Sequence, residues 1–386
     1  MLGVKMNIRE LHTIYRENMY IEEFNFVDTM LANYFTTQLE GEPLWNFPIA
    51  PSSYGKTELM RPLMKLSKIK NMVHGDNINP YGIIMIDQAN ANAFSSGVRD
   101  KIDIGSKLQD RKTFILIPDL ASIMSAKPEE SASLFALWRT LYDGYISKHT
   151  GTNNKIYDNI HVNVFACSTP IIRNNLEFSA QMGTRELLYE INKVKNVEGM
   201  VDNVVTEEGR ENMYQGVKQF IDERKNLEFV ELNDKEKTFI KRASHYISGW
   251  RAVGDVDRDG YLTSGLDKEY PPRLYKQLSK LWIGLKTLGL EFIEIRDIVI
   301  EINNGVGDRL RRKVFEALYD KDEYGMKTPA QKNRKEIAAE LNRSPNTIMA
   351  QLMILRELKL IEPMGSEVFR SETLWTTNAK NLETGI

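Results

Sequence analysis

Five short runs of apolar, β-branched or aromatic residues alternate with helical or loop material in the first half of the chain. They lie at residues 44–50, 82–87, 113–118, 160–168 and 186–191. Strands that alternate with helices predict an α/β fold with a largely parallel sheet. Such sheets bind ligands at the carboxyl ends of their strands, so the residues after each run are the first candidates for chemistry.

The next part of the chain, up to residue 320, shows helical periodicity and little strand signal. The helical patterns lie at residues 210–226, 234–248, 272–288 and 295–302. Residues 319–325 are charged, contain a glycine and lack periodicity, which is typical of a linker. Together the patterns predict an N-terminal helical segment (1–43), an α/β core (44–195), a helical domain (196–320) and a C-terminal domain (321–386).

Composition excludes several classes of protein. The chain has no apolar run of about 18 residues, so no membrane span is expected, and its charged, amphipathic N-terminus does not resemble a secretory signal. We therefore expect a cytoplasmic protein. The single cysteine, Cys167, excludes an internal disulfide and predicts a small buried side chain, and the scattered histidines suggest no zinc site.

The net charge of −2 restricts any binding of nucleic acid to local basic patches. One such patch is residues 327–360, which carry seven Lys and Arg against three Glu.

The first apolar run continues into a tight loop and then into a helix that starts at Gly55-Lys56-Thr57. The N–H groups of such a loop cradle phosphates, the lysine reaches the outer phosphates, and the hydroxyl ligates Mg²⁺. Ala50 stands where the usual pattern has its first glycine, and an ordinary strand-to-helix turn stays open as an alternative. The predicted nucleotide-binding residues are Pro51, Ser52, Ser53, Tyr54, Gly55, Lys56, Thr57 and Glu58.

Two further strand ends carry polar residues. Asp119 follows the third run, where an acidic group can hold Mg²⁺ together with Thr57. The next residue is Leu120, not the glutamate that would activate water, so nucleotide binding is better supported than hydrolysis. Thr169 follows the fourth run and could orient water or touch the γ-phosphate. Helix capping by Asp119 and a strand-end turn set by Pro170 are the alternatives.

The order of these motifs resembles that of AAA+ ATPases from phages, archaea and mobile elements, distant relatives of the minichromosome-maintenance helicases. The resemblance covers residues 45–288, and its motifs are Leu-Tyr-Asp-Gly-Tyr-Ile-Ser-Lys at 141–148, Gly-Thr at 151–152, Ser-Thr-Pro at 168–170 and Gly-Thr-Arg-Glu-Leu-Leu-Tyr at 183–189. It implies a P-loop NTPase core with a helical lid, ATP and Mg²⁺ as cofactors, and assembly into a homo-oligomeric, hexameric ring. It also implies that Arg185 is an arginine finger for a neighbouring subunit and that Arg273 is a sensor in the lid.

Residues 144–157 read as two arms around a turn rich in glycine and asparagine, which predicts a β-hairpin. Related helicases carry such a hairpin in the ring channel. Lys148, His149 and Lys155 are therefore predicted to contact DNA phosphates. A solvated loop is the alternative.

The C-terminal patch has helix-turn-helix spacing. One helix is predicted at 334–341, and Ser344-Pro345 opens a second, in which Ile348, Leu352 and Leu355 face inward. Two strands of a wing at 360–363 with 367–369 and 373–375 complete the pattern of a winged helix. The front of the second helix would be Asn346, Thr347, Met349, Ala350 and Gln351, of which Asn346, Thr347 and Gln351 are predicted to contact bases, with Lys335 and Arg343 on phosphates. Winged helices also bind proteins, and this alternative stays open.

Residues 255–263 begin like a calcium loop, with Asp255, Asp257, Asp259 and then Gly260. The twelfth position is Leu266 and not the bidentate glutamate that completes such a site. We interpret this stretch as a solvated turn.

The combined prediction is an ATP-dependent AAA+ motor that acts on single- or double-stranded DNA, as a helicase or helicase-like replication factor of a virus or mobile element. Two alternatives remain: a nucleotide-gated DNA-binding regulator or partition factor, and a helicase loader.

Overall fold

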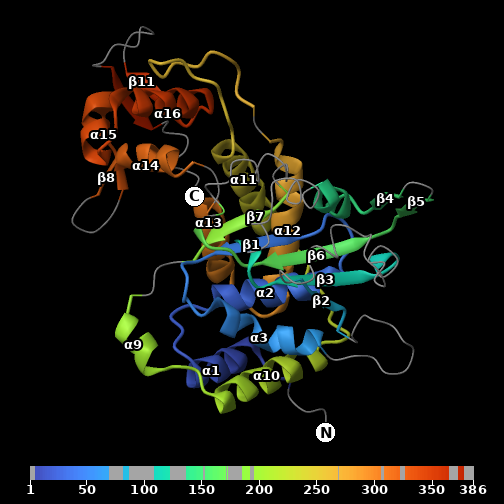
Figure 1. Ribbon diagram of the computed structural model, residues 1–386. Coiled ribbons are helices and arrows are strands. Elements are labelled where there is room, and N and C mark those ends of the chain that lie inside the picture. Colours follow the sequence, from blue (N-terminus) through green and yellow to red (C-terminus); the bar gives the residue numbers. More distant parts are fainter. Residues whose placement is uncertain are drawn as a thin grey trace. The chain divides into compact units, whose positions relative to one another are not determined.

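The five predicted strands form one sheet in the computed structural model of the protein (Figure 1). They are β1 (Trp45–Ile49), β2 (Ile83–Met85), β3 (Lys112–Ile117), β6 (His161–Ala166) and β7 (Leu187–Glu190). Their order is β2-β3-β6-β1-β7, and every neighbouring pair is parallel. The predicted α/β fold with a parallel sheet is therefore confirmed.

The structure describes residues 5–68, 81–86, 108–121, 136–150, 153–170, 172, 185–191, 195–267, 269–305, 308–321, 327–364 and 373–377. The chain divides into two compact units. Unit 1 is Met1–Lys237 with Lys276–Gly305, and unit 2 is Thr238–Tyr275 with Val306–Ile386. The four-part division suggested by the sequence stays a prediction.

Helices cover both faces of the sheet. On one face, Trp45 packs edge-on against Trp138, in the helical residues 136–142, with 5.8 Å between ring centroids. On the other face, α2 (Asn25–Phe35) crosses β1 and β6, and Phe26 lies edge-on to Phe165 at 5.3 Å. Because helices cover both faces, every residue of β1 is buried, which explains its continuous apolar pattern.

A second layer of helices lies over α3 (Lys56–Ser67) in unit 1. It consists of α1 (Ile8–Asn18) and α10 (Glu207–Asp222), which pack against each other (Figure 1). The buried Tyr15 of α1 donates its hydroxyl to the Leu59 carbonyl of α3 at 3.2 Å. Gly216 lets α10 approach α1 closely, because a Cβ there would lie 2.9 Å from Ile14 Cδ1. The helix predicted at 210–226 therefore packs on the layered core.

Two buried asparagines fasten α2 to the sheet. The Asn33 side chain donates to the Val164 carbonyl at 2.8 Å, and the Asn163 side chain donates to the Asn33 carbonyl at 2.9 Å. The Asn163 side-chain oxygen accepts from the Leu44 N–H at 2.8 Å, just before β1. Buried amides need such partners, so this clasp favours one position of α2 on the sheet.

A buried lysine ties α12 (Pro271–Thr287) to the amino end of the sheet. Lys280 Nζ donates to the carbonyls of Leu39 and Glu42, at 3.0 and 3.1 Å, and lies 3.1 Å from His161 Nε2. Burial lowers the pKa of Lys280 to about 7, and burial beside Lys280 lowers the pKa of His161 to about 4. The remaining elements of unit 1 are η1 (Thr36–Gln38), α9 (Val197–Asp202) and α13 (Phe292–Gly305), together with the hairpin of β4 (Ile146–Thr150) and β5 (Asn153–Tyr157).

Unit 2 combines helices with a small antiparallel sheet. Its helices are α14 (Arg309–Ala317), α15 (Arg334–Leu341) and α16 (Pro345–Glu357), together with most of α11 (Asp234–Trp250). The sheet has the order β10-β12-β11, with β10 at Lys332–Asn333, β11 at Ile361–Met364 and β12 at Leu374–Thr377. The two predicted helices are present, and Ser344 caps the second by accepting from the Thr347 N–H at 3.1 Å. The wing residues 367–369 lie outside the described residues.

Sequence patterns did not predict α14, β10 or the hairpin of β8 (Tyr319–Lys321) and β9 (Lys327–Pro329). The hairpin begins inside the stretch that we expected to be a linker. The charged residues of this hairpin show no alternation of apolar and polar positions, because an exposed two-stranded ribbon needs no apolar face of its own.

A buried arginine joins three elements of unit 2. Arg311 of α14 is 4% exposed and donates to the carbonyls of Trp250 and Ala252 at the end of α11, at 3.1 and 2.6 Å. Its Nε donates to the Gln351 side-chain oxygen of α16 at 3.1 Å. The guanidinium thus caps the carboxyl end of α11 and holds α16 beside it.

The depressed pKa of Lys280 predicts a pH dependence of stability. Between about pH 7 and 10.5 the unfolded chain holds a proton that the folded chain has lost, so this lysine makes the free energy of unfolding rise with pH. The Lys280→Met variant should lack that rise. One pKa unit corresponds to ~1.4 kcal/mol. Between pH 7 and pH 9.5, the free energy of unfolding of the wild type, measured by urea denaturation, should therefore rise by more than this amount relative to that of the variant. Parallel curves for the two proteins would contradict the prediction.

Candidate nucleotide site

The strand order marks one position in the sheet as a ligand site. From β1 the chain crosses toward β2, whereas from β6 it crosses past β1 to β7. Open α/β sheets bind ligands where neighbouring connections leave in opposite directions, at the carboxyl ends of the strands. The loop after β1, which holds the predicted phosphate-binding residues, starts at this position.

That loop is built on two residues with left-handed backbone conformation. Ser53 has φ 64° and Gly55 has φ 90°, and α3 starts directly after Gly55. Left-handed residues within a turn direct successive N–H groups toward one point and so form anion-binding nests. The conformation at Gly55 favours glycine, because a Cβ is strained there. The Gly-Lys-Thr pattern thus has the strand-loop-helix context that a phosphate cradle requires.

Lys56 folds back across this loop. Its Nζ donates to the carbonyls of Ala50 and Pro51, both at 2.7 Å. Burial lowers the pKa of Lys56, while Cys167 and the charge of Asp119 act in the opposite direction. Lys56 and Asp119, which lie far apart in the sequence, therefore converge closely enough for their charges to interact.

Backbone hydrogen bonds produce this convergence. The Ala50 N–H donates to the Ser168 carbonyl at 3.1 Å, and the Leu120 N–H donates to the Cys167 carbonyl at 2.8 Å. The ends of β1, β3 and β6 therefore lie at one edge. Cys167 is buried there as predicted, with Sγ 3.0 Å from Met60 Sδ, and burial raises the pKa of its thiol.

Asp119 makes the helix-capping contact that its position suggested, and its role as a ligand of Mg²⁺ stays a prediction. Its Oδ1 accepts from the Ala121 N–H at 3.1 Å, as a helix cap does, while the residue as a whole is exposed. Thr57 is also exposed, and its hydroxyl and the Asp119 carboxylate are the oxygen ligands that Mg²⁺ prefers. Leu120 is fully buried, and Thr169, in the segment that follows β6, is half-buried. The donor set therefore fits Mg²⁺ held jointly with phosphate oxygens.

An apolar pocket adjoins the phosphate loop, and the sequence did not reveal it. Its volume is about 220 Å³. The lining includes Met19, Tyr20, Gly55, Met200, Val204 and Val205. No sequence motif joins these segments, because they meet only when α1, α3 and α9 come together.

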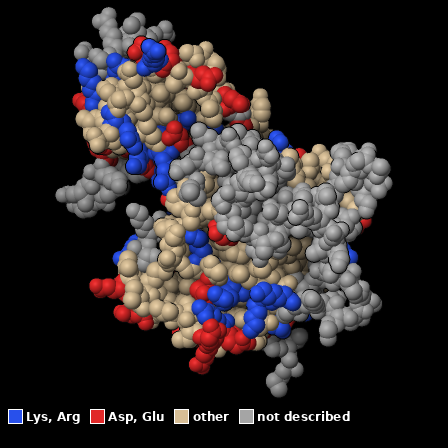
Figure 2. All heavy atoms as spheres, in the orientation of Figure 1, with Lys and Arg blue, Asp and Glu red and all other residues tan. Residues whose placement is uncertain are grey.

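An ion-pair network borders the pocket. Glu58 accepts from Arg61 at 2.7 Å and from Arg210 at 2.9 Å, and these arginines hold the pKa of its carboxyl down against burial. Lys and Arg gather beside Asp and Glu on this face, over α3 and α10 (Figure 2). Glu58, predicted to touch the nucleotide, is thus held in place by α10.

Arg185 lies at the amino ends of the strands, whereas Lys56 lies at their carboxyl ends. It precedes β7, whose Leu187 pairs with Asn46 near the start of β1. With five residues in β1 at about 3.3 Å each, the two edges are roughly 15 Å apart. The guanidinium pairs with Asp143 at 2.8 Å and lies 5.5 Å from the Tyr142 ring centroid.

Two other predicted features have known positions but untested roles. Arg273 is half-buried in the first turn of α12, in unit 2, and its contact with a nucleotide stays a prediction. The predicted hairpin is present as β4 and β5, ahead of β6 (Figure 1). The side chains of Lys148, His149 and Lys155 lie outside the described residues, as do residues 151–152 and 183–184 of the resemblance motifs.

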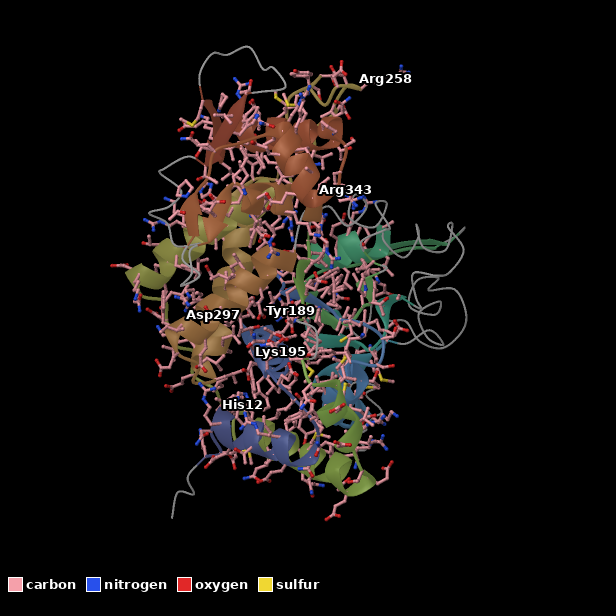
Figure 3. The ribbon with its side chains drawn as sticks, turned by 90° about the vertical axis from the view of Figure 1, so that its left-hand side faces the viewer. His12, Tyr189, Lys195, Arg258, Asp297 and Arg343 are labelled. Atoms are coloured by element: carbon pink, nitrogen blue, oxygen red, sulfur yellow. The ribbon has the colours of Figure 1, made fainter. Side chains whose placement is uncertain are left out.

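The predicted DNA-contacting residues of unit 2 divide into two groups. Lys335, Arg343, Asn346 and Thr347 are exposed, and Arg343 projects outward in Figure 3. Gln351 instead is half-buried, accepts from Arg311 at 3.1 Å and donates to Asp308 at 3.1 Å.

Met349 was expected at the exposed front of α16 but is 1% exposed. The reason is a tertiary contact, because the loop at residues 255–263 packs on this helix. Within that loop, Asp257 Oδ1 accepts from the N–H groups of Asp259 and Tyr261, both at 2.9 Å.

Comparison with known proteins identifies no relative: no family model matches the sequence, and no curated protein matches it either. None of the helices in the described part of the chain combines the length and apolar character of a membrane span. In the same residues, no group of three or more His, Cys, Asp and Glu side chains could hold a metal by itself.

The Arg185–Asp143 pair yields a stability prediction. The arginine side chain is 14% exposed and the aspartate side chain 39%, so Asp143→Asn should lower the free energy of unfolding by about 1 kcal/mol through loss of a charged acceptor. The control is Asp297→Asn (Asp297 is labelled in Figure 3), which breaks a pair with Arg296 that is 39% and 51% exposed and should cost under about 0.5 kcal/mol. Chemical denaturation measures both, and equal losses would contradict the prediction.

Proposed function

We propose that this protein is an ATP-dependent AAA+ motor that acts on DNA and works as a ring of identical subunits. The observation that carries the proposal is the convergence of Lys56 and Asp119 at the carboxyl edge of a parallel sheet. A lysine at a helix start and a carboxylate on a neighbouring strand end are the two charges that a bound magnesium-nucleotide requires.

The residues of the site have distinct roles in this proposal. The carbonyls of Ala50 and Pro51 hold the Lys56 ammonium beside the loop, and phosphate oxygens would replace them. Thr57 and Asp119 would hold Mg²⁺, which supplies positive charge against the phosphate oxygens. Met19, Val204 and Val205 offer the apolar surface for a nucleobase.

The position of Arg185 supports assembly. Because the residue lies at the sheet edge away from Lys56, it cannot complete the site of its own subunit. When the arginine of one subunit meets the nucleotide of the next, the two subunits make a head-to-tail contact. Such contacts can close into rings, here proposed to be hexameric. The Asp143 carboxylate and Tyr142 ring would position the guanidinium for this contact.

DNA would meet two parts of the chain. The β4–β5 hairpin supports a contact in the ring channel, with Lys148, His149 and Lys155 on the phosphates. In unit 2, the order α14-α15-α16 with the β10-β12-β11 sheet supports the winged-helix interpretation. The α12 and α13 helices, with Arg273, would contribute the lid. A virus or mobile element is the proposed source of such a replication factor.

One observation favours a second candidate, a nucleotide-gated DNA-binding regulator. Leu120 is fully buried where a water-activating glutamate would follow Asp119. A protein that binds ATP without rapid hydrolysis would change its affinity for DNA on ATP binding but would not separate the strands of a forked duplex.

Removal of the Lys56 ammonium tests the motor directly. Lys56→Ala should lower DNA-stimulated ATP hydrolysis and unwinding of a forked duplex by about 10²-fold or more, because one charged donor to the transferred phosphate is lost. The control is Lys65→Ala on the same helix, which breaks the surface pair with Glu211 and should leave both activities unchanged. Full unwinding by Lys56→Ala would refute the proposal.

A mixing experiment tests the role of Arg185 in a neighbouring subunit. Lys56→Ala and Arg185→Ala should each be inactive alone, while an equal mixture should recover roughly a quarter of the wild-type ATPase rate. In randomly assembled rings, about one contact in four brings an intact Lys56 of one subunit beside an intact Arg185 of its neighbour. Thermal melting must first show that both variants are folded. No recovery in co-assembled subunits would mean that the arginine does not act across the contact.

A further inference from the structure

A structured loop in unit 2 lies on α16, the helix that was predicted to contact DNA bases. We call residues 253–267 the cover loop. Its two ends are joined by backbone hydrogen bonds between Val253 and Asp267, at 2.8 Å in both directions. Next to this stem, Arg251 and Glu269 form an ion pair at 3.0 Å whose side chains are 6% and 10% exposed. The cover loop is therefore a fixed projection from the end of α11.

The tip of the cover loop is held in one shape. The Asp257 carboxylate accepts two backbone N–H groups, and Gly260 adopts φ 87°. Tyr261 and Leu262 pack against the hydrophobic core of unit 2. These contacts place the backbone of Gly260 against α16.

The contact with α16 is a direct backbone approach. A Cβ at Gly260 would lie 2.7 Å from the Ala350 N and would collide with the Asn346 carbonyl oxygen. The Asn346 side chain donates to the Arg258 carbonyl at 3.0 Å. Asn346 and Ala350 are one turn apart on the helix, so the cover loop lies along the first turns of α16.

These are the turns that a helix-turn-helix protein inserts into the major groove. The cover loop engages the Asn346 amide and lies against the backbone at Ala350, so a DNA groove cannot seat on this face even though Asn346 keeps exposed surface beside the loop. The tip also opposes DNA electrostatically, since exposed Asp255, Asp257 and Asp259 outnumber Arg258. Both the shape and the charge of the loop therefore act against DNA at α16.

We propose that the cover loop is an autoinhibitory element that must leave α16 before this helix can contact DNA. The proposal rests on the proposed function, in which α16 meets DNA. The opposite arrangement, in which the loop adds Arg258 to the DNA interface, is less consistent with three exposed carboxylates at the tip. The Arg258 side chain projects outward (Figure 3), but its carbonyl accepts from the Asn346 side chain at 3.0 Å, so faster trypsin cleavage after this residue reports release of the loop.

The test uses the glycine that permits the close contact. In the full chain, Gly260→Ala should force the loop away from α16, because the new Cβ meets the helix backbone and the backbone conformation is strained. The matched control is Gly265→Ala in the same loop, where an added Cβ meets nothing within 4 Å. Fluorescence anisotropy with a duplex of about 20 base pairs measures affinity, and a trypsin time course measures release.

The proposal expects Gly260→Ala to be cleaved faster after Arg258 and to bind duplex DNA at least about fivefold more tightly, with Gly265→Ala like the wild type. A second variant, Asp255→Asn with Asp259→Asn, leaves the Asp257 contacts intact and should also bind more tightly. Faster cleavage with unchanged DNA affinity would overturn the proposal, and weaker binding would place the loop in the DNA interface. Unaltered cleavage would show that Gly260 does not hold the loop. If no form of the protein binds DNA, the proposed DNA role fails instead.

Discussion

The candidate site depends on a few backbone hydrogen bonds that end three strands at one edge. Ser168 donates to the Pro48 carbonyl at 3.0 Å and accepts from Ala50, while Cys167 donates to the Ile117 carbonyl at 2.9 Å. Because the pairing is parallel, the loops that follow these strands must emerge together. A shift of one residue in this register would exchange the side chains that pack against the two helical layers and disrupt the packing of both faces. The core therefore enforces the meeting of Lys56 and Asp119.

The same parallel arrangement separates the candidate polar residues of unit 1 into two sets. Lys56, Thr57 and Asp119 follow strands, whereas Asp143 and Arg185 precede them. Lys280 and His161 also lie at the amino edge, where carbonyls of the connection between η1 and β1 receive the lysine. A sheet whose strands all run one way thus has two chemically different rims. In the proposed ring, this polarity would let one copy complete the site of another without a second type of subunit.

Buried polar groups specify how the layers are joined. Asn33 of α2 donates to the Val164 carbonyl of β6, and Asn163 of β6 donates to the Asn33 carbonyl. Arg311 joins α11, α14 and α16. Apolar contacts alone tolerate several packings of similar energy, but a buried amide or guanidinium must find its partners. The cover loop follows the same logic, since its backbone contact with α16 is possible only at a glycine. In both units, a small number of polar or steric contacts selects one arrangement from those that burial would permit.

The sequence by itself determined the strands, most of the helices and the turn that leads from β1 into α3, because each has a local cause. Buried strands require continuous apolar runs, Ser344 caps the helix that follows it, and Gly55 supplies a backbone conformation that other residues resist. Lys56 and Asp119 could be placed at the same edge because parallel strands share their direction. Only the tertiary structure decided the rest. The pocket beside Gly55, the partners of Arg185 and Lys280, and the burial of Met349 under the cover loop join residues that are distant in sequence. No local periodicity encodes such contacts, because their free energy arises only after the segments have packed together.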